Sequence, residues 1–159
     1  MSAEDNLINP VRQRMQAGGV SLGMPVRLGR SGDIARIARS TGHDFIFIDC
    51  QHSLFNLETI GHIASTAMAC GVAPLVRVRG IDDPDVSLLL DNGVMGIVYP
   101  DINTAAEARR AVDACKFAPV GKRSVSGGYP ALRLSRGAAD RKRAAAQRQL
   151  SAGLHDRDH

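Results

Sequence analysis

The chain has 159 residues and a mass of 17.0 kDa, which suits one domain or part of a larger one. Hydrophobic residues make up 44% and charged residues 23%, a composition that excludes disordered and fibrous classes. Its apolar runs fall far short of the roughly 20 residues that cross a bilayer, and its first 15 residues lack the apolar core of a secretory signal. The three cysteines lie far apart without metal-ligand spacing, so we expect reduced thiols in a cytoplasmic protein without membrane contact.

The net charge of +4 is confined to one end of the chain. Residues 1–131 hold 13 basic and 13 acidic side chains, whereas residues 132–159 hold seven basic and three acidic ones. A basic tail on a neutral domain can bind nucleic acid, and such a non-catalytic binding module is one hypothesis. The tail has no aromatic residue for base stacking and no known motif, so a nucleic-acid partner is not expected.

Short apolar runs alternate with helix-like stretches between residues 18 and 120. The pattern predicts strands at 20–22, 45–48, 74–78 and 95–99, and helices at 33–40, 57–70, 85–91 and 104–114. Asn56 is expected to cap the second helix, and Thr104 with Glu107 forms a capping box at the start of the last. Repeated strand–helix units leave two architectures, a doubly wound sheet or a (β/α) barrel, and four units reach only half of a full barrel.

Functional residues in parallel α/β layers lie just past the carboxyl ends of the strands. His52 follows the second predicted strand, where its imidazole could accept and return a proton near neutral pH or simply cap the next helix. Arg77 lies inside the third predicted strand, where a guanidinium needs an anion, either a structural carboxylate such as Asp49 or a bound substrate. His43 and His62 are expected to be surface or packing residues, and no glycine motif for a nucleotide is present.

Five segments resemble, in order, the HpcH/HpaI aldolase family, metal-dependent class II aldolases of hydroxy-keto acids that are related to citrate lyase β-subunits. The matching segments are GHDFIFIDCQH (42–52), PLVRV (74–78), LDNGVMGI (90–97), EAR (107–109) and FAPVGKR (117–123). The resemblance implies a TIM-type (β/α)8 barrel. Residues 1–131 would form its first four βα units, a half-barrel, and residues 132–159 would form a basic tail that does not resemble the family.

The resemblance also implies an activity, the retro-aldol cleavage of 4-hydroxy-2-oxo acids to pyruvate and an aldehyde, impaired in this chain because half of the barrel is missing. It assigns His52 as the base, Arg77 as the group that stabilises the enolate, and Asp91 as the carboxylate that raises the basicity of the histidine. The pattern itself places Asp91 at a helix end on the opposite face of the layer. Gln51 stands where many members have Glu. A citrate-lyase-type acyl-CoA lyase on the same barrel is the alternative.

The family implies a divalent metal (Mg, Mn or Co) and a small keto acid as ligands. The family's metal-binding Glu and Asp lie beyond the residues that match, so this chain is expected to supply no metal ligand. The run of His and Asp at residues 155–159 is interpreted as coincidence. The open half-barrel exposes two strand edges, so self-association into a homo-oligomer is expected.

The tail suggests a change of reading frame near Ala131. With a suitable choice of synonymous codons, a one-base shift turns residues 132–134 into a Phe-Asp-Phe segment of the family type. The same shift turns residues 146–158 into a strand-like segment that contains a glutamate. The hypothesis is therefore that 132–159 is an out-of-frame or poorly ordered tail, and sequencing the coding DNA tests it.

Overall fold

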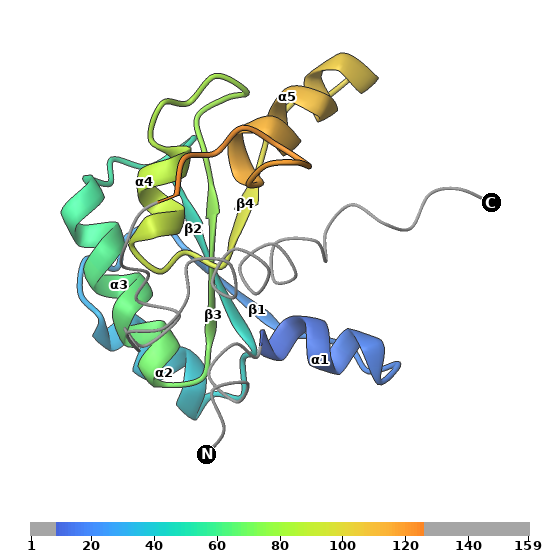
Figure 1. Ribbon diagram of the computed structural model, residues 1–159. Coiled ribbons are helices and arrows are strands. Elements are labelled where there is room, and N and C mark those ends of the chain that lie inside the picture. The colour runs from blue at the N-terminus through green and yellow to red at the C-terminus, as the bar shows by residue number, and fades with distance from the viewer. Residues whose placement is uncertain (1–8, 126–159) are drawn as a thin grey trace.

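The computed structural model describes residues 9–125 (Figure 1). The predicted tail at 132–159 and the His and Asp run at 155–159 lie outside this range. None of the helices within 9–125 is long and apolar enough to cross a membrane. In chain order, the elements are α1 (Pro10–Gln16), β1 (Gly23–Val26), α2 (Asp33–Ser40), β2 (Phe45–Asp49), α3 (Leu57–Ala69), β3 (Ala73–Arg77), α4 (Val86–Asp91), β4 (Gly96–Val98) and α5 (Ala105–Cys115).

The order of the strands decides between the two architectures that the sequence leaves open. The sheet runs β1-β2-β3-β4, and each strand pairs in parallel with the next strand of the chain. A doubly wound sheet reverses direction at a switch point, whereas a barrel adds every new strand to the same edge. Helices α2, α3 and α4 lie on one face of the sheet (Figure 1). The described residues therefore form four βα units of a TIM-type barrel, as predicted.

The core lies between the sheet and these helices. On β2, Ile46 and Ile48 are fully buried against the helices, where they meet Ile60 and Ile63 of α3. Successive side chains of a strand point to opposite faces, so Phe45, Phe47 and Asp49 share the other face. That face would be the interior of a closed barrel, and it carries the polar residues that matter below.

The helix ends follow the predicted caps. Asn56 accepts a hydrogen bond from the Thr59 backbone N–H at 2.8 Å at the start of α3. At the start of α5, Thr104 accepts from the Glu107 N–H at 3.2 Å, and Glu107 accepts from the Thr104 N–H at 2.9 Å. The capping box is therefore confirmed, and the helix begins where the sequence placed it to within one residue.

The prediction of the first strand is wrong by three residues. The strand is Gly23–Val26, and Val20 and Leu22 are 76% and 53% exposed. Gly23 pairs in register with Phe45, and a Cβ on Gly23 would lie 2.1 Å from the Phe45 ring. The strand therefore uses a glycine to pass the ring, and this contact overrides the higher strand propensity of residues 20–22.

Helix α1 is not among the predicted elements. Its N-cap is Asn9, whose side chain accepts hydrogen bonds from two backbone N–H groups, and Pro10 occupies the first helical position. The helix has only seven residues and buries none of them. It therefore lacks the apolar stripe by which sequence periodicity reveals a helix.

Candidate active site

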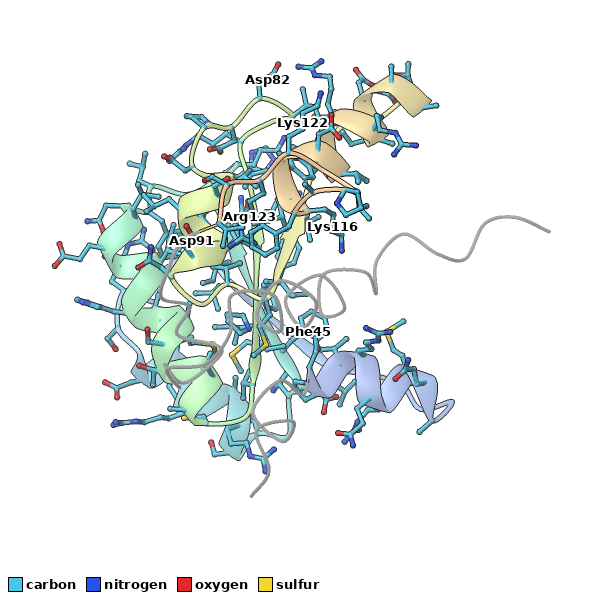
Figure 2. The ribbon with its side chains drawn as sticks, in the orientation of Figure 1. Phe45, Asp82, Asp91, Lys116, Lys122 and Arg123 are labelled. Atoms are coloured by element: carbon cyan, nitrogen blue, oxygen red, sulfur yellow. The ribbon has the colours of Figure 1, made fainter. Side chains whose placement is uncertain are left out.

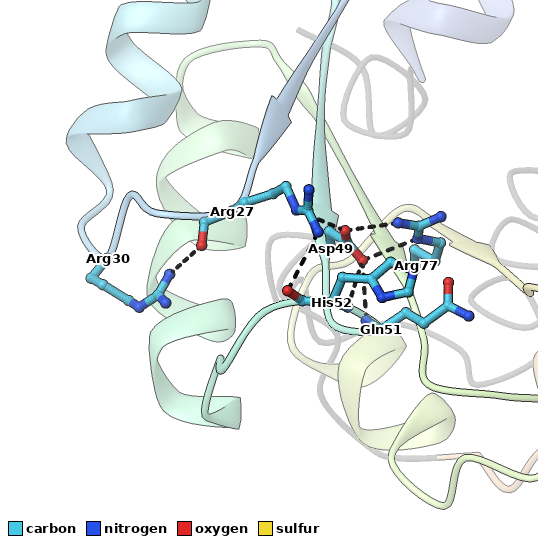
Figure 3. Close-up of polar contacts among 6 residues, drawn as sticks. All are labelled: Arg27, Arg30, Asp49, Gln51, His52 and Arg77. Atoms are coloured by element: carbon cyan, nitrogen blue, oxygen red, sulfur yellow. Dashed lines mark hydrogen bonds and ion pairs between the residues drawn. The ribbon is translucent and has the colours of Figure 1, made fainter.

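An ion pair joins the carboxyl ends of β2 and β3. Asp49 and Arg77 are register partners on these adjacent strands, so their side chains leave the same face of the sheet. Arg77 donates from Nε to Asp49 Oδ1 at 3.0 Å and from Nη2 to Asp49 Oδ2 at 2.7 Å (Figure 3). This two-bond geometry is the strong form of an arginine–carboxylate contact. The anion beside Arg77 is thus the structural carboxylate, one of the two alternatives that the sequence leaves open.

The environment of Asp49 keeps its carboxylate ionised. Only 3% of the side chain is exposed, and burial opposes the charge. The hydrogen bonds from Arg77 outweigh burial and lower the pKa of Asp49 from 3.8 to about 2. The backbone N–H groups of Gln51 and His52 add hydrogen bonds to Oδ1 at 3.1 and 3.2 Å. Asp49 therefore acts as a fixed negative charge that organises the loop after β2.

His52 lies in this loop and is exposed. Asp49 holds its backbone N–H, and Arg27 Nη2 reaches its carbonyl oxygen at 3.5 Å. The contacts among residues 9–125 give the imidazole itself no hydrogen bond. The loop is thus held through its backbone while the ring stays accessible to a ligand. The structure brings His52 and Arg77 together through Asp49.

Asp91 is not part of this arrangement. It is the last residue of α4, and the chain next enters β4, so it lies toward the amino end of the parallel strands. His52 lies at the carboxyl end. Asp91 forms an ion pair with Arg123, whose side chain is 2% exposed (Figure 2). The structure therefore places Asp91 in a structural ion pair on the far side of the layer, where the helix pattern had put it.

The other polar candidates lie apart from this ion pair. The Nδ1 atom of His43 lies 2.8 Å from the Thr41 hydroxyl, and His62 is part of α3. A shallow depression is lined by the loop at 50–55 and by Arg79. Neither Asp49 nor Arg77 lines it, and Cys50 belongs to the core on the helix face. His52 is among the residues that line this depression, so the predicted base borders it although the Asp49–Arg77 pair does not.

The described residues do not fit a divalent metal. Within 9–125 there is no group of three or more His, Cys, Asp or Glu side chains that could hold one. Asp49 directs both of its oxygens at arginines and backbone N–H groups.

Arg27 also contacts Asp49, and the sequence reasoning did not single it out. It follows the last residue of β1, and its Nε lies 3.2 Å from Asp49 Oδ2. The rule that functional residues follow strand ends would have found it. With the first strand predicted at 20–22, however, the residues that follow its end do not include Arg27.

Comparison with known proteins agrees with the fold. A family model described as HpcH/HpaI aldolase/citrate lyase matches residues 27–150. This match includes residues 132–150 of the predicted tail. That the tail is out of frame and does not belong to the family stays a proposal. Among solved structures, that of an HpcH/HpaI aldolase from Desulfitobacterium hafniense DCB-2 superposes with a TM-score of 0.78 and 28% identity, covering 89% of this chain and 53% of that one.

Two curated fungal proteins are also similar to the chain. The 4-hydroxy-4-methyl-2-oxoglutarate aldolase cghB of Chaetomium globosum is 42% identical over 127 residues, which cover 78% of this chain and 46% of that protein. The 4-hydroxy-4-methyl-2-oxoglutarate aldolase tasA of Hapsidospora irregularis is 37% identical over 129 residues, which cover 79% and 47%. The chain thus spans about half the length of the curated relatives it matches.

Proposed function

The chain belongs to the HpcH/HpaI aldolase/citrate lyase family, and on that premise we propose that it carries the proton-transfer and anion-binding half of a carbon–carbon lyase site. The reaction is the retro-aldol cleavage of a 4-hydroxy-2-oxo acid to pyruvate and an aldehyde. The observation that carries this proposal is the Asp49 carboxylate, which binds Arg77 through its side chain and His52 through its backbone at one end of the sheet.

In the proposed reaction, His52 accepts the proton of the substrate's C4 hydroxyl group. The C3–C4 bond then breaks, the C4 oxygen becomes the carbonyl of the aldehyde, and the bonding electrons move onto the 2-oxo group as an enolate. Protonation at C3, with the proton returned by the imidazolium, completes pyruvate. His52 is suited to this role because its ring is accessible and its backbone is held in place.

Arg77 stabilises the negative charge of the enolate. Its side chain is 28% exposed although two of its nitrogens bind Asp49, so the guanidinium can still meet a ligand above the sheet. The contact with Asp49 holds the guanidinium in one orientation, which is what stabilisation of a developing oxyanion requires. Asp49 thus positions both proposed catalytic groups.

The family is one of metal-dependent class II aldolases, and a divalent ion would act on the enolate as a Lewis acid. Because residues 9–125 offer no group of ligands for it, the ion is given no residue and no step in the proposed reaction.

The proposal extends to a cytoplasmic location, to a homo-oligomer in which copies cover the open edges of β1 and β4, and to a domain boundary near residue 131.

Pyruvate release from 4-hydroxy-4-methyl-2-oxoglutarate, with added Mg²⁺, Mn²⁺ or Co²⁺, tests the proposal. Because C4 of this substrate carries a methyl group, its C4 half leaves as a second pyruvate, a ketone in place of the aldehyde. The 159-residue chain is compared with a version whose DNA is read in the shifted frame after codon 131. We expect release by the frame-shifted version and little or none by the 159-residue chain. His52→Ala should abolish the release, and His62→Ala on α3 is the matched control. Absence of release from both versions, or cleavage of an acyl-CoA substrate in its place, would overturn the proposal.

A further inference from the structure

Arg27 is a second guanidinium on the Asp49 carboxylate, on the opposite side from Arg77 (Figure 3). Both arginines approach the same oxygen, Asp49 Oδ2, at 3.2 Å from Arg27 Nε and 2.7 Å from Arg77 Nη2. The two guanidiniums are therefore only a few ångströms apart. Since one carboxylate cannot neutralise two guanidiniums, the three residues together carry a net positive charge at the carboxyl end of the sheet.

Arg27 also has hydrogen-bond donors to spare. A guanidinium has five N–H donors in a planar fork. Arg27 directs Nε at Asp49, and Nη2 reaches the His52 carbonyl at 3.5 Å, the outer limit of a hydrogen bond. Its Nη1 makes no hydrogen bond to any residue within 9–125. The side chain is 55% exposed, so these donors are open to a ligand beside His52.

Two neighbouring arginines are engaged elsewhere. The Arg30 guanidinium lies 4.0 Å from the centre of the Phe55 ring, and its Nη1 donates to the Arg27 carbonyl at 3.0 Å. Arg79 faces two carboxylates, Asp83 at 3.5 Å and Asp85 at 3.2 Å. Of these three arginines, Arg27 is the one that lies on the Asp49 carboxylate beside the proposed base.

We propose that Arg27 binds a second carboxylate of the substrate and thereby selects dicarboxylic 4-hydroxy-2-oxo acids over monocarboxylic ones. The inference rests on the proposed function, in which Arg77 holds the reacting end. A substrate with an anionic group at each end can then meet one guanidinium on either side of Asp49. Arginine suits this role because its planar fork can bind both oxygens of a carboxylate.

Binding of two matched oxo acids to the 159-residue chain tests the inference without relying on turnover. The probes are 2-oxoglutarate and 2-oxopentanoate, which have the same five-carbon chain and differ in the second carboxylate. Dissociation constants come from NMR titrations of backbone amides, which also report whether each variant is folded. We expect the wild-type chain to bind 2-oxoglutarate about tenfold more tightly, the size of one charge-assisted hydrogen bond.

Arg27→Gln should abolish this preference, so that the ratio of the two dissociation constants is about one, and should change 2-oxopentanoate binding by less than about twofold. Arg27→Lys should keep part of the preference. Arg36→Gln, on the 72%-exposed Arg36 of α2, changes the net charge equally and should keep the preference. A preference that survives Arg27→Gln, or a variant that weakens both probes equally, overturns the inference and leaves the proposed function standing. If the folded wild-type chain binds neither probe, the oxo-acid site of the proposed function fails as well.

Discussion

Asp49 and Arg77 occupy matching register positions at the carboxyl ends of two neighbouring parallel strands, and the nearly buried carboxylate receives two hydrogen bonds from one guanidinium. The register places both side chains on the inner face of the half-barrel. Because Asp49 also binds the backbone of His52, one carboxylate connects two strands to the loop that carries the proposed base. The pair is therefore expected to contribute both to the stability of the fold and to the proposed function, and substitutions can test each contribution.

Asp49→Asn is expected to lower the free energy of unfolding by about 1–3 kcal/mol. The amide keeps the shape of the carboxylate but leaves Arg77 and Arg27 without their common negative partner. Urea denaturation of wild type and variant measures the difference. Asp33→Asn is the matched control, since Asp33 and Arg36 are both about 70% exposed and their pair should contribute less than about 1 kcal/mol. Equal effects of the two substitutions would contradict the role given to Asp49.

Acid should remove the contribution of Asp49 within a defined pH range. The native pKa of this carboxyl, about 2, is lower than its value of 3.8 without partners, because Arg77 donates hydrogen bonds to the charged form. Between about pH 2 and 4 the unfolded chain binds more protons than the native chain. The stability that Asp49 contributes is therefore complete above about pH 4 and is lost as the pH drops toward 2. Denaturation at several pH values should show that Asp49→Asn flattens this loss while Asp33→Asn retains it. A parallel loss in wild type and Asp49→Asn would contradict the pKa assignment.

Asp91→Asn tests whether Asp91 acts in catalysis or in structure. Arg123 is buried, so removing the charge of Asp91 beside it should cost about 3 kcal/mol of unfolding free energy. Asp113→Asn breaks the pair with the 84%-exposed Lys122 and should cost less than about 1 kcal/mol. The two variants are compared by urea denaturation. A fully stable Asp91→Asn protein, together with a shifted pH profile of pyruvate release when the same substitution is made in the frame-shifted version, would instead support the catalytic role implied by the resemblance.

Lys116 is expected to destabilise the native chain at neutral pH. Its ammonium group is buried without a hydrogen-bond partner among the described residues, and burial lowers its pKa from 10.5 to about 8. Lys116→Met should therefore raise the free energy of unfolding at pH 7 by about 1–2 kcal/mol. Lys122→Met, at an exposed position, is the control.

Because the pKa of Lys116 is lowered, the free energy of unfolding is expected to rise at alkaline pH. Between about pH 8 and 10.5 the unfolded chain holds the Lys116 proton that the native chain has released, so the stability of wild type rises relative to Lys116→Met. Denaturation at pH 7, 8.5 and 10 measures this difference. A constant gap between the two proteins across this range would show that the Lys116 amine is not desolvated.

Local patterns were sufficient for most of the secondary structure. The helices at 33–40 and 104–114 were predicted to within one residue, the first from its apolar spacing and the second from its capping box, because both signals act over a few neighbouring positions. His52 and Arg77 were chosen as candidate site residues from their places at the ends of apolar runs, and their catalytic roles stay predictions. The family resemblance added the barrel, which the order of the strands confirms.

Contacts between distant parts of the chain decide the features that the sequence alone did not predict, which are the position of β1 and the partners of the charged side chains. Gly23 belongs to β1 because Phe45 lies beside it, and the misplaced strand hid Arg27. Arg77 reaches Asp49 across 28 positions and Arg123 reaches Asp91 across 32. Which cation meets which anion depends on strand register and helix packing, since side chains so far apart in sequence become neighbours when the backbone has folded. The sequence shows which residues of this chain are charged, whereas the three-dimensional arrangement determines which of them pair.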